Sequence, residues 1–163
     1  MARTLQTWLA ISHHAAFRIG GWAYVRADGA LLTGQAGGDR RTDAERAALA
    51  GLVAALNGVD GSRPMVIQTA SALVAAVPAR IDAARAGADA PTEHLDLWAQ
   101  AATALAKASV QILRVDAPPG SPSAFAAAWA ELARDKAKDK GPFTAAIPKS
   151  NLAKAGVEPT REP

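Results

Sequence analysis

A short polar step interrupts the most apolar stretch of this sequence. Residues 64–77 read PMVIQTASALVAAV, and Thr69 and Ser71 carry the hydroxyl groups of the step. A hydroxyl becomes a nucleophile only where a base activates it, and no such base lies beside these two in the sequence. Hydroxyls at the start of a helix more often cap it. We therefore expect Thr69 and Ser71 to be helix caps, with substrate binding as the alternative.

Histidine and carboxylate residues form a second candidate group. His13 and Asp116 end two predicted strands, and Glu45 lies in the first turn of a predicted helix. If the fold brings them together, they could hold Zn²⁺ or Mn²⁺. His14 points to the opposite face of its strand, so only one of the two histidines can join such a site. Glu45 also has a simpler role, because with Thr42 it completes a capping-box pattern.

The elements that position these residues begin with an antiparallel meander. Apolar and polar side chains alternate at the start of the chain, which is the period of a half-buried strand. Asp28-Gly29 is a strong hairpin signal. The predicted strands cover residues 5–11, 22–27 and 30–33, and a glycine-rich loop is expected over residues 34–41.

Helical spacing dominates the rest of the chain, with two apolar strands between the helices. A first helix begins at Thr42 and ends at Asn57-Gly58, and Thr92 is predicted to cap a longer one. His94 is expected at the solvated surface. The remaining predictions are strands at residues 65–67 and 110–115, helices at 72–77 and 79–86, and a final helix from Ser123 with Phe125, Trp129 and Leu132 facing inward. The four tryptophans are expected in the core or at interfaces.

This order predicts an α/β fold. A meander that feeds strand–helix–strand units implies a five-stranded mixed sheet, antiparallel meander plus parallel strands, with helices on both faces. Residues 1–140 are expected to form one domain. Residues 141–163 are rich in Pro, Lys and Thr, which predicts an extended or disordered tail.

Charge and composition limit the classes of partner. Of 18 basic and 15 acidic residues, seven basic and four acidic ones lie in residues 134–163, which leaves eleven of each in the remaining chain. A nucleic-acid footprint is a basic stripe on the folded body, so composition favours such a partner only weakly. No apolar run approaches the length of a membrane span, and the chain has no cysteine. We expect a cytoplasmic protein with no membrane contact.

Several motifs, in this order and spacing, resemble the ribonuclease H family. The resemblance covers about residues 5–137. The motifs are Gly20-Gly21-Trp22-Ala23, Arg41-Thr42 followed by Arg46-Ala47-Ala48-Leu49, Thr69-Ala70-Ser71, Leu95-Asp96-Leu97-Trp98 and Trp129-Ala130-Glu131-Leu132-Ala133-Arg134. The resemblance implies a ribonuclease H-like fold.

The resemblance also implies a chemistry whose residues are missing. In such ribonucleases, four carboxylates hold two divalent cations that activate water to cut the RNA strand of an RNA–DNA hybrid. The matching positions are Ala10 (or Ser12, if the first loop is gapped), Ala48, Ala70 and Ala130. Roughly a quarter of the chain is alanine, so four unrelated positions would all be alanine only about once in a few hundred trials. The coincidence favours true replacement, either natural or deliberate, and four changes favour a natural pseudoenzyme.

Three hypotheses follow. The first is a catalytically inactive ribonuclease H-like domain that binds an RNA–DNA hybrid, double-stranded RNA or a protein partner, with Thr42, Asp43, Thr69 and Ser71 as candidate substrate contacts and no cofactor expected. The second is an active hybrid endonuclease, seen as an inactivated form or with Mg²⁺ or Mn²⁺ held by residues such as His13, Asp43, Glu45 or Asp116. The third is a purely structural domain that forms a homodimer.

Overall fold

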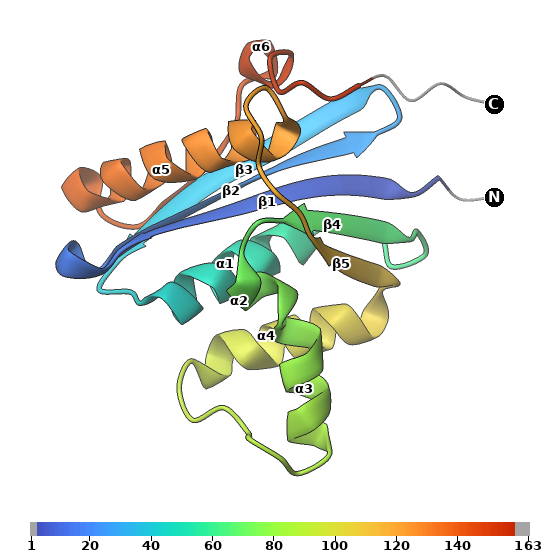
Figure 1. Cartoon of the computed structure of the whole chain (residues 1–163), viewed down its shortest axis with the longest axis vertical. Coiled ribbons are helices and arrows are strands. Elements are labelled where there is room, and N and C mark those ends of the chain that lie inside the picture. Colours follow the sequence, from blue (N-terminus) through green and yellow to red (C-terminus); the bar gives the residue numbers. More distant parts are fainter. Residues whose placement is uncertain (1–2, 159–163) are drawn as a thin grey trace.

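A six-stranded mixed sheet runs through the centre of the molecule (Figure 1). The computed structural model describes residues 3–158. The first three strands form an antiparallel meander, two further strands extend it in parallel, and the sixth pairs antiparallel with the third. The strands are β1 (Leu5–His14), β2 (Ile19–Asp28), β3 (Leu31–Arg40), β4 (Met65–Thr69), β5 (Val110–Arg114) and β6 (Phe143–Ala146). Their order in the sheet is β5-β4-β1-β2-β3-β6.

Helices cover both faces of the sheet (Figure 1). One face packs against a group of four helices, and the other packs against a single long helix and a short one. The helices are α1 (Ala44–Leu56), α2 (Ala72–Ala75), α3 (Val77–Arg85) and α4 (Leu95–Lys107) on the first face, and α5 (Pro122–Lys140) and α6 (Lys149–Leu152) on the second. A single 3-10 turn, Ala15–Phe17, joins β1 to β2. No helix in residues 3–158 is long and apolar enough to cross a membrane.

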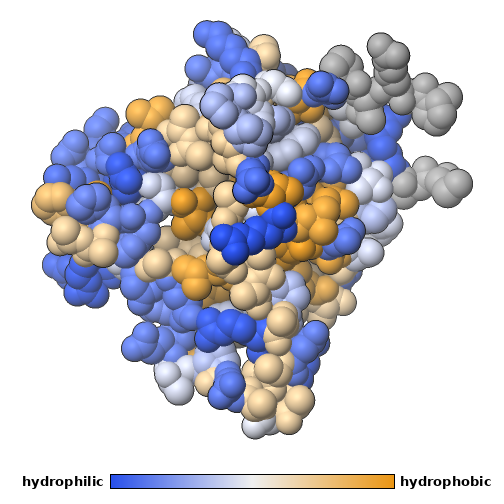
Figure 2. Space-filling view, in the orientation of Figure 1, coloured by the Kyte–Doolittle hydropathy of each residue, from blue (hydrophilic) through white to orange (hydrophobic). Residues whose placement is uncertain are grey.

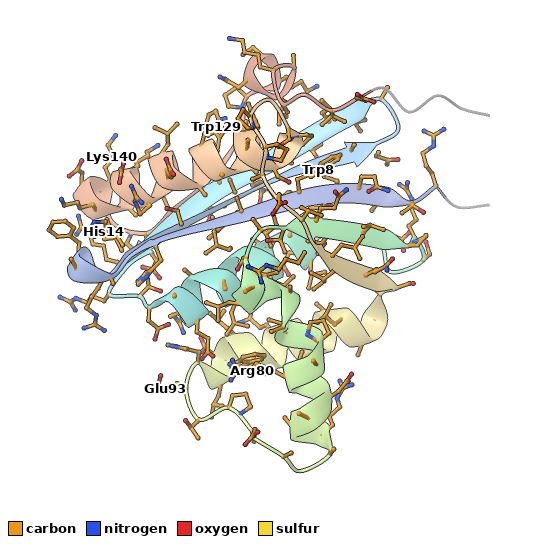
Figure 3. The ribbon with its side chains drawn as sticks, viewed as in Figure 1. Trp8, His14, Arg80, Glu93, Trp129 and Lys140 are labelled. Atoms are coloured by element: carbon orange, nitrogen blue, oxygen red, sulfur yellow. The ribbon has the colours of Figure 1, made fainter. Side chains whose placement is uncertain are left out.

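The alternating side chains of β1 and β2 divide the core into two layers. Leu5 and Leu9 of β1 enter the layer under α1 and α4, whereas Trp8 and Ala10 face the α5 side. This is the period of two that the sequence pattern predicts for β1. Figure 3 labels Trp8 of β1 and Trp129 of α5. Both side chains pack against the core cluster between the sheet and α5. The predicted apolar stripe of α1, from Leu49 to Leu56, is buried in the first layer.

Small residues let α5 lie directly on the sheet. A Cβ atom added to Gly21 of β2 would stand 2.3 Å from the carbonyl oxygen of Ala130. One added to Gly38 of β3 would stand 2.7 Å from the carbonyl oxygen of Ala133. The buried residues of α5 are correspondingly small: Ser123, Ala126, Ala130, Ala133 and Ala137. The predicted inward position of Leu132 is wrong, since this side chain is 61% exposed.

The glycine-rich stretch predicted as a loop is part of a strand. β3 continues to Arg40, and Gly34 to Gly38 pair with β2 throughout. Glycine lowers strand propensity, but here the absence of a side chain permits the close approach of α5 and of the Trp22 ring. The prediction of a loop was wrong because it rested on the low strand propensity of glycine. The close packing of α5 and Trp22 on these residues decides the structure instead.

The sheet has one strand more than predicted. Phe143–Ala146 forms β6 at the edge of β3, and Ile147, Leu152 and Ala155 beyond it are buried. The sequence predicted an extended or disordered tail from residue 141. Residues 143–146 are extended, but as a paired strand, and the helix α6 follows. The last residues of that predicted tail, 159–163, lie outside the described part of the chain.

Three helix starts also differ from prediction. α4 begins at Leu95, after His94 in a left-handed conformation with φ of 56°, and not at a cap on Thr92. α3 begins at Val77 and not at Ala79, so Pro78 lies in its first turn, where its missing N–H leaves no backbone hydrogen bond unmade. α1 is capped by Asp43, whose side chain accepts from the Arg46 amide, and not by Thr42.

Candidate functional site

A pocket of about 280 Å³ lies where β1, the end of β4 and the start of α5 come together. Ala70 and Ser71 of the polar step that stood out in the sequence line this pocket. No residue of its wall carries a carboxylate, and most side chains there are small or apolar. The wall consists of Leu9, Ala10, Ile11, His13, Ala44, Ala70, Ser71, Leu73, Ala117, Ser123 and Ala127.

Strand register brings the first part of the wall together. Leu9 of β1 pairs in parallel with Thr69 of β4, so Ala10 and Ala70 follow at neighbouring points of the two strands. The Thr69 hydroxyl accepts a hydrogen bond from the Ser71 amide at 3.1 Å, and the Ser71 hydroxyl accepts one from the Val74 amide at 3.2 Å. Ser71 therefore caps α2 as predicted, whereas Thr69 orders the turn before the helix and does not cap it. Whether they also contact a substrate stays a prediction.

His13 forms the far side of the wall. Its Nε2 atom lies 3.1 Å from the carbonyl oxygen of Thr42. A carbonyl can only accept, so Nε2 carries the proton and donates it. Thr42 is itself buried, and its amide donates to the carbonyl of Arg18. These bonds fix the end of β1 against the start of α1.

The first turn of α5 closes the pocket. Ser121 caps this helix by accepting from the Ala124 amide at 3.1 Å. Ser123 and Ala127, one turn apart, face the pocket. Ser123 is only 7% exposed, and its side chain has no hydrogen-bond partner in residues 3–158.

The four alanines singled out in the sequence divide into two pairs. Ala10 and Ala70 line the pocket. Ala48 is buried between α1 and the sheet, and Ala130 is buried against β2. On both helices a residue nearer the N-terminus lines the pocket instead: Ala44 on α1, and Ala127 on α5. Ser12, the alternative to Ala10, lies outside the wall and accepts a hydrogen bond from Arg134.

The wall does not fit the two divalent cations that the resemblance implies. Mg²⁺ takes hard oxygen ligands, and two adjacent dications need anionic ligands to offset their repulsion. The pocket offers two serine hydroxyls and one imidazole whose Nε2 proton is already committed to Thr42. We therefore derive no metal-dependent step at this site.

The predicted group of His13, Glu45 and Asp116 does not form a cluster of three ligands in the described chain. Glu45 forms an ion pair with Arg80 of α3. The Arg80 guanidinium in turn lies 4.5 Å from the centre of the Trp98 ring. Asp116 is exposed in the connection between β5 and α5. The side chain of Glu45 thus holds α1 against α3, and not against the end of β1.

A different group of possible ligands comes together at the starts of α1 and α4. Ligand atoms of Asp43, Glu93 and His94 lie within 4.8 Å of one another. His94 Nε2 is 2.8 Å from Asp43 Oδ2, and its Nδ1 is 3.5 Å from Nη1 of Arg46. Figure 3 shows Glu93 on the connection between α3 and α4. The sequence offered Asp43 as a possible metal ligand but neither Glu93 nor His94, since nothing local indicates that residues about 50 positions apart meet.

The position of the proton on His94 indicates that this group links two helices and does not hold a metal. A guanidinium can only donate, so Nδ1 of His94 accepts from Arg46 and Nε2 donates to Asp43. A metal at Nε2 would force the proton onto Nδ1, against the Arg46 charge. Burial opposes ionisation of Asp43, but hydrogen bonds from the Arg46 amide and from His94 outweigh it and hold its pKa below the usual range. Arg46 likewise lowers the pKa of Asp96.

A larger hollow, of about 550 Å³, lies between the C-terminal ends of α1 and α4. Its polar side chains include Asn57, Gln100 and Lys107, all exposed. No strand ends there, and no buried polar group of the described chain lines it. We therefore take the smaller pocket as the candidate site.

The surface of the molecule carries both apolar and polar patches (Figure 2). Figure 2 shows apolar side chains gathered over the middle of one face, where β4, β5 and the following connection lie, while polar side chains dominate its periphery. His14 and Lys140 lie at the same end of the molecule in Figure 3. At that end Lys138 lies over the Phe17 ring, 3.9 Å from its centre.

Comparison of the sequence with protein-family models and with curated proteins gave no match. Comparison of the structure with solved structures gave similar folds. LC9-RNase H1, described as a type 1 RNase H with the type 2 active-site motif, has a TM-score of 0.62 at 17% identity, over 99% of this chain and 90% of that one. RNase H1 from the archaeon Halobacterium salinarum has a TM-score of 0.56 at 19% identity, over 82% and 99%.

The N-terminal RNase H domain of rv2228c from Mycobacterium tuberculosis gives a similar result. Its TM-score is 0.57 at 17% identity, over 82% of this chain and 95% of that one. Identity to each of the three structures is below one fifth, so the similarity is one of fold alone. This chain has the ribonuclease H-like fold.

Proposed function

We propose that this chain is a ribonuclease H-like domain that binds nucleic acid and does not cleave it. The observation that carries the proposal is the pocket at the ends of β1 and β4, whose wall holds alanines and hydroxyls in place of carboxylates. Two-metal hydrolysis needs anionic ligands at that place to hold its cations. Without them the scaffold keeps its shape but has no group that activates water.

Two exposed arginines beside the pocket support a nucleic-acid partner. His13 of the pocket wall donates to the carbonyl of Thr42, and the Thr42 amide donates to the carbonyl of Arg18. Arg18 and Arg41, which precedes Thr42 in the chain, therefore lie next to the bonds that fix His13. In residues 3–158 neither guanidinium has an ion-pair or hydrogen-bond partner. Cations left free beside a neutral pocket are suited to the phosphates of a nucleic-acid backbone.

A cleavage assay tests the inactive half of the proposal. The chain is incubated with a labelled RNA–DNA hybrid and Mg²⁺ or Mn²⁺, beside a variant with carboxylates at four residues of the pocket wall: Ala10→Asp, Ala44→Glu, Ala70→Asp and Ala127→Asp. We expect no cleavage by the chain itself and cleavage by the variant. A second variant carries the glutamate at the predicted position, Ala48→Glu in place of Ala44→Glu. It tests whether a carboxylate at that buried residue can hold a metal ion. Cleavage by the unaltered chain would show that a metal is held elsewhere, and the proposal would fail.

Fluorescence anisotropy at low salt tests the binding half. We expect the chain to bind an RNA–DNA hybrid or double-stranded RNA, and Arg18→Gln and Arg41→Gln each to lower the slope of log K against log salt by about one. Lys107→Gln, at the far end of α4, serves as the control and should leave the slope unchanged. A homodimer without affinity for either nucleic acid would favour the structural alternative.

A further inference from the structure

The Ser123 hydroxyl is a largely buried polar group at the wall of the candidate pocket. Ser123 is 7% exposed, and its side chain has no hydrogen-bond partner in residues 3–158. Leaving a buried hydroxyl unpaired is unfavourable, so such groups are rare in folded proteins. The hydroxyl is not sealed off from solvent, since Trp98 Nε1 is the only fully enclosed polar side-chain atom without a partner in the described chain. Ser123 meets solvent at the pocket wall.

The start of α5 supplies a second donor next to this hydroxyl. The first N–H groups of a helix have no acceptor within the helix. At α5 the Ser121 hydroxyl and carbonyl accept from Ala124 and Phe125, and Pro122 has no N–H. In residues 3–158 the Ser123 amide has no backbone or side-chain acceptor. One residue therefore offers an N–H and an O–H at the positive end of a helix of 19 residues.

The wall around these donors suits an anion. No acidic residue lines the pocket, and the Ser71 hydroxyl, which accepts from Val74, still has its own proton to donate. At about 280 Å³ the pocket is below the roughly 300–1,000 Å³ of sites for drug-sized ligands. It therefore fits a small anionic group better than a whole nucleotide.

We propose that this pocket binds one phosphate group of a nucleic-acid backbone directly, without metal ions, through the amide and hydroxyl of Ser123. This inference rests on the proposed function, and it assigns the contact that holds the nucleic acid. Hydrogen bonds from an N–H and an O–H to a phosphate oxygen are charge-assisted and strong. The same pocket that lacks ligands for cations thus acts as an anion site at a helix N-terminus.

Amide NMR of the whole chain tests the contact. Inorganic phosphate is titrated first, and a short RNA–DNA hybrid second. We expect a saturable shift of the Ser123 amide with both, and competition between them. Ser123→Ala should weaken both affinities about five- to tenfold, and Ser123→Asp should abolish them by charge repulsion. Ser109→Ala, an exposed serine at the opposite end of β5, should change neither.

The variants remain informative because both replacements are compatible with the first turn of a helix. Circular dichroism should show unchanged folding, and thermal unfolding should show no loss of stability for Ser123→Ala, since the hydroxyl has no partner to lose. A Ser123 amide that ignores phosphate overturns the contact, whether or not the hybrid binds. Phosphate binding at Ser123 without hybrid binding assigns the pocket to free phosphate, and overturns the proposed function as well.

Discussion

The carboxylate of Asp43 joins two helices that are far apart in the sequence. One oxygen accepts from the Arg46 amide and so caps α1. The other accepts from Nε2 of His94, which precedes α4 by one residue. Arg46 completes the group by pairing with Asp96 at 3.2 Å. A single side chain thus orients the start of α1, on which Ala44 reaches the candidate pocket.

Replacing Asp43 separates its capping role from its charge. Asp43→Ala removes the cap and should lower the free energy of unfolding at pH 7 by about 1 kcal/mol, within the 0.5–2 kcal/mol range of such caps. Asp43→Asn keeps a capping oxygen and should cost less. Because the folded-state pKa of Asp43 is lowered, its ionic contribution is present above the unfolded pKa near 3.9 and is lost as pH falls through the folded value.

Urea unfolding at pH 7 and pH 3 measures this prediction. The difference in stability between the chain and Asp43→Asn should shrink at pH 3, while Asp43→Ala should remain less stable than Asp43→Asn. If the difference in the free energy of unfolding between the unaltered chain and Asp43→Asn is the same at pH 7 and pH 3, the neighbours of Asp43 do not stabilise its ionised carboxylate in the folded state.

Local residue chemistry is the part of the site that the sequence predicted well. Ser71 caps α2 through a bond to a residue three positions later, so its role is contained in one short segment. His94 was predicted at the solvated surface, yet its side chain is only 16% exposed and contacts α1. Its partner is 51 positions away. Such a pairing follows from the path of the α3–α4 connection, which no local pattern specifies.

At the scale of elements, α5 depends on the absence of side chains beneath it. The predicted apolar face of Phe125, Trp129 and Leu132 assumed that a helix packs through its large residues. Phe125 and Trp129 do contact the core edge, but the central contact is a row of alanines on glycine-containing strands. Alanine is the best helix former and glycine a poor strand former. The pattern of small residues on both partners was therefore hard to recognise from either segment alone.

Gly21→Ala tests this contact. The new Cβ would meet backbone atoms of Ala130 and Arg134 at 2.3 and 2.4 Å, and backbone cannot move aside as a flexible side chain can. We expect a loss of about 3 kcal/mol in the free energy of unfolding, at the upper end of overpacking effects. Gly87→Ala is the matched control. It has open space around it but a positive φ of 85°, so only the backbone cost of about 1 kcal/mol should remain.

Urea unfolding of both variants gives the comparison. If Gly21→Ala costs no more than Gly87→Ala, then α5 lies farther from β2 than the structure shows. The wall of the pocket would then also change, because Ser123 and Ala127 belong to the same helix.

For the whole molecule, the order of strands and helices was the most predictable feature. The meander, the two parallel strands and the helices on both faces follow from periodicity and turn signals spread over the chain, so errors at single positions did not matter. The C-terminal segment was less predictable, because its Pro- and Lys-rich composition resembles a solvated tail. In the structure Ile147 and Leu152 are buried against the α5 layer, which only the completed sheet could reveal.

This segment should therefore contribute to global stability. Leu152→Ala removes a side chain that is 3% exposed and should lower the free energy of unfolding by about 2–4 kcal/mol. A chain ending at Lys140 also loses β6 and exposes the edge of β3, so it should melt at a still lower temperature and aggregate. Lys154→Ala, an exposed change in the same segment, should leave the melting temperature unchanged. Calorimetry of the three variants and the full chain decides the matter: equal melting temperatures for the shortened and full chains would mean that residues 141–163 are the independent tail that composition predicts.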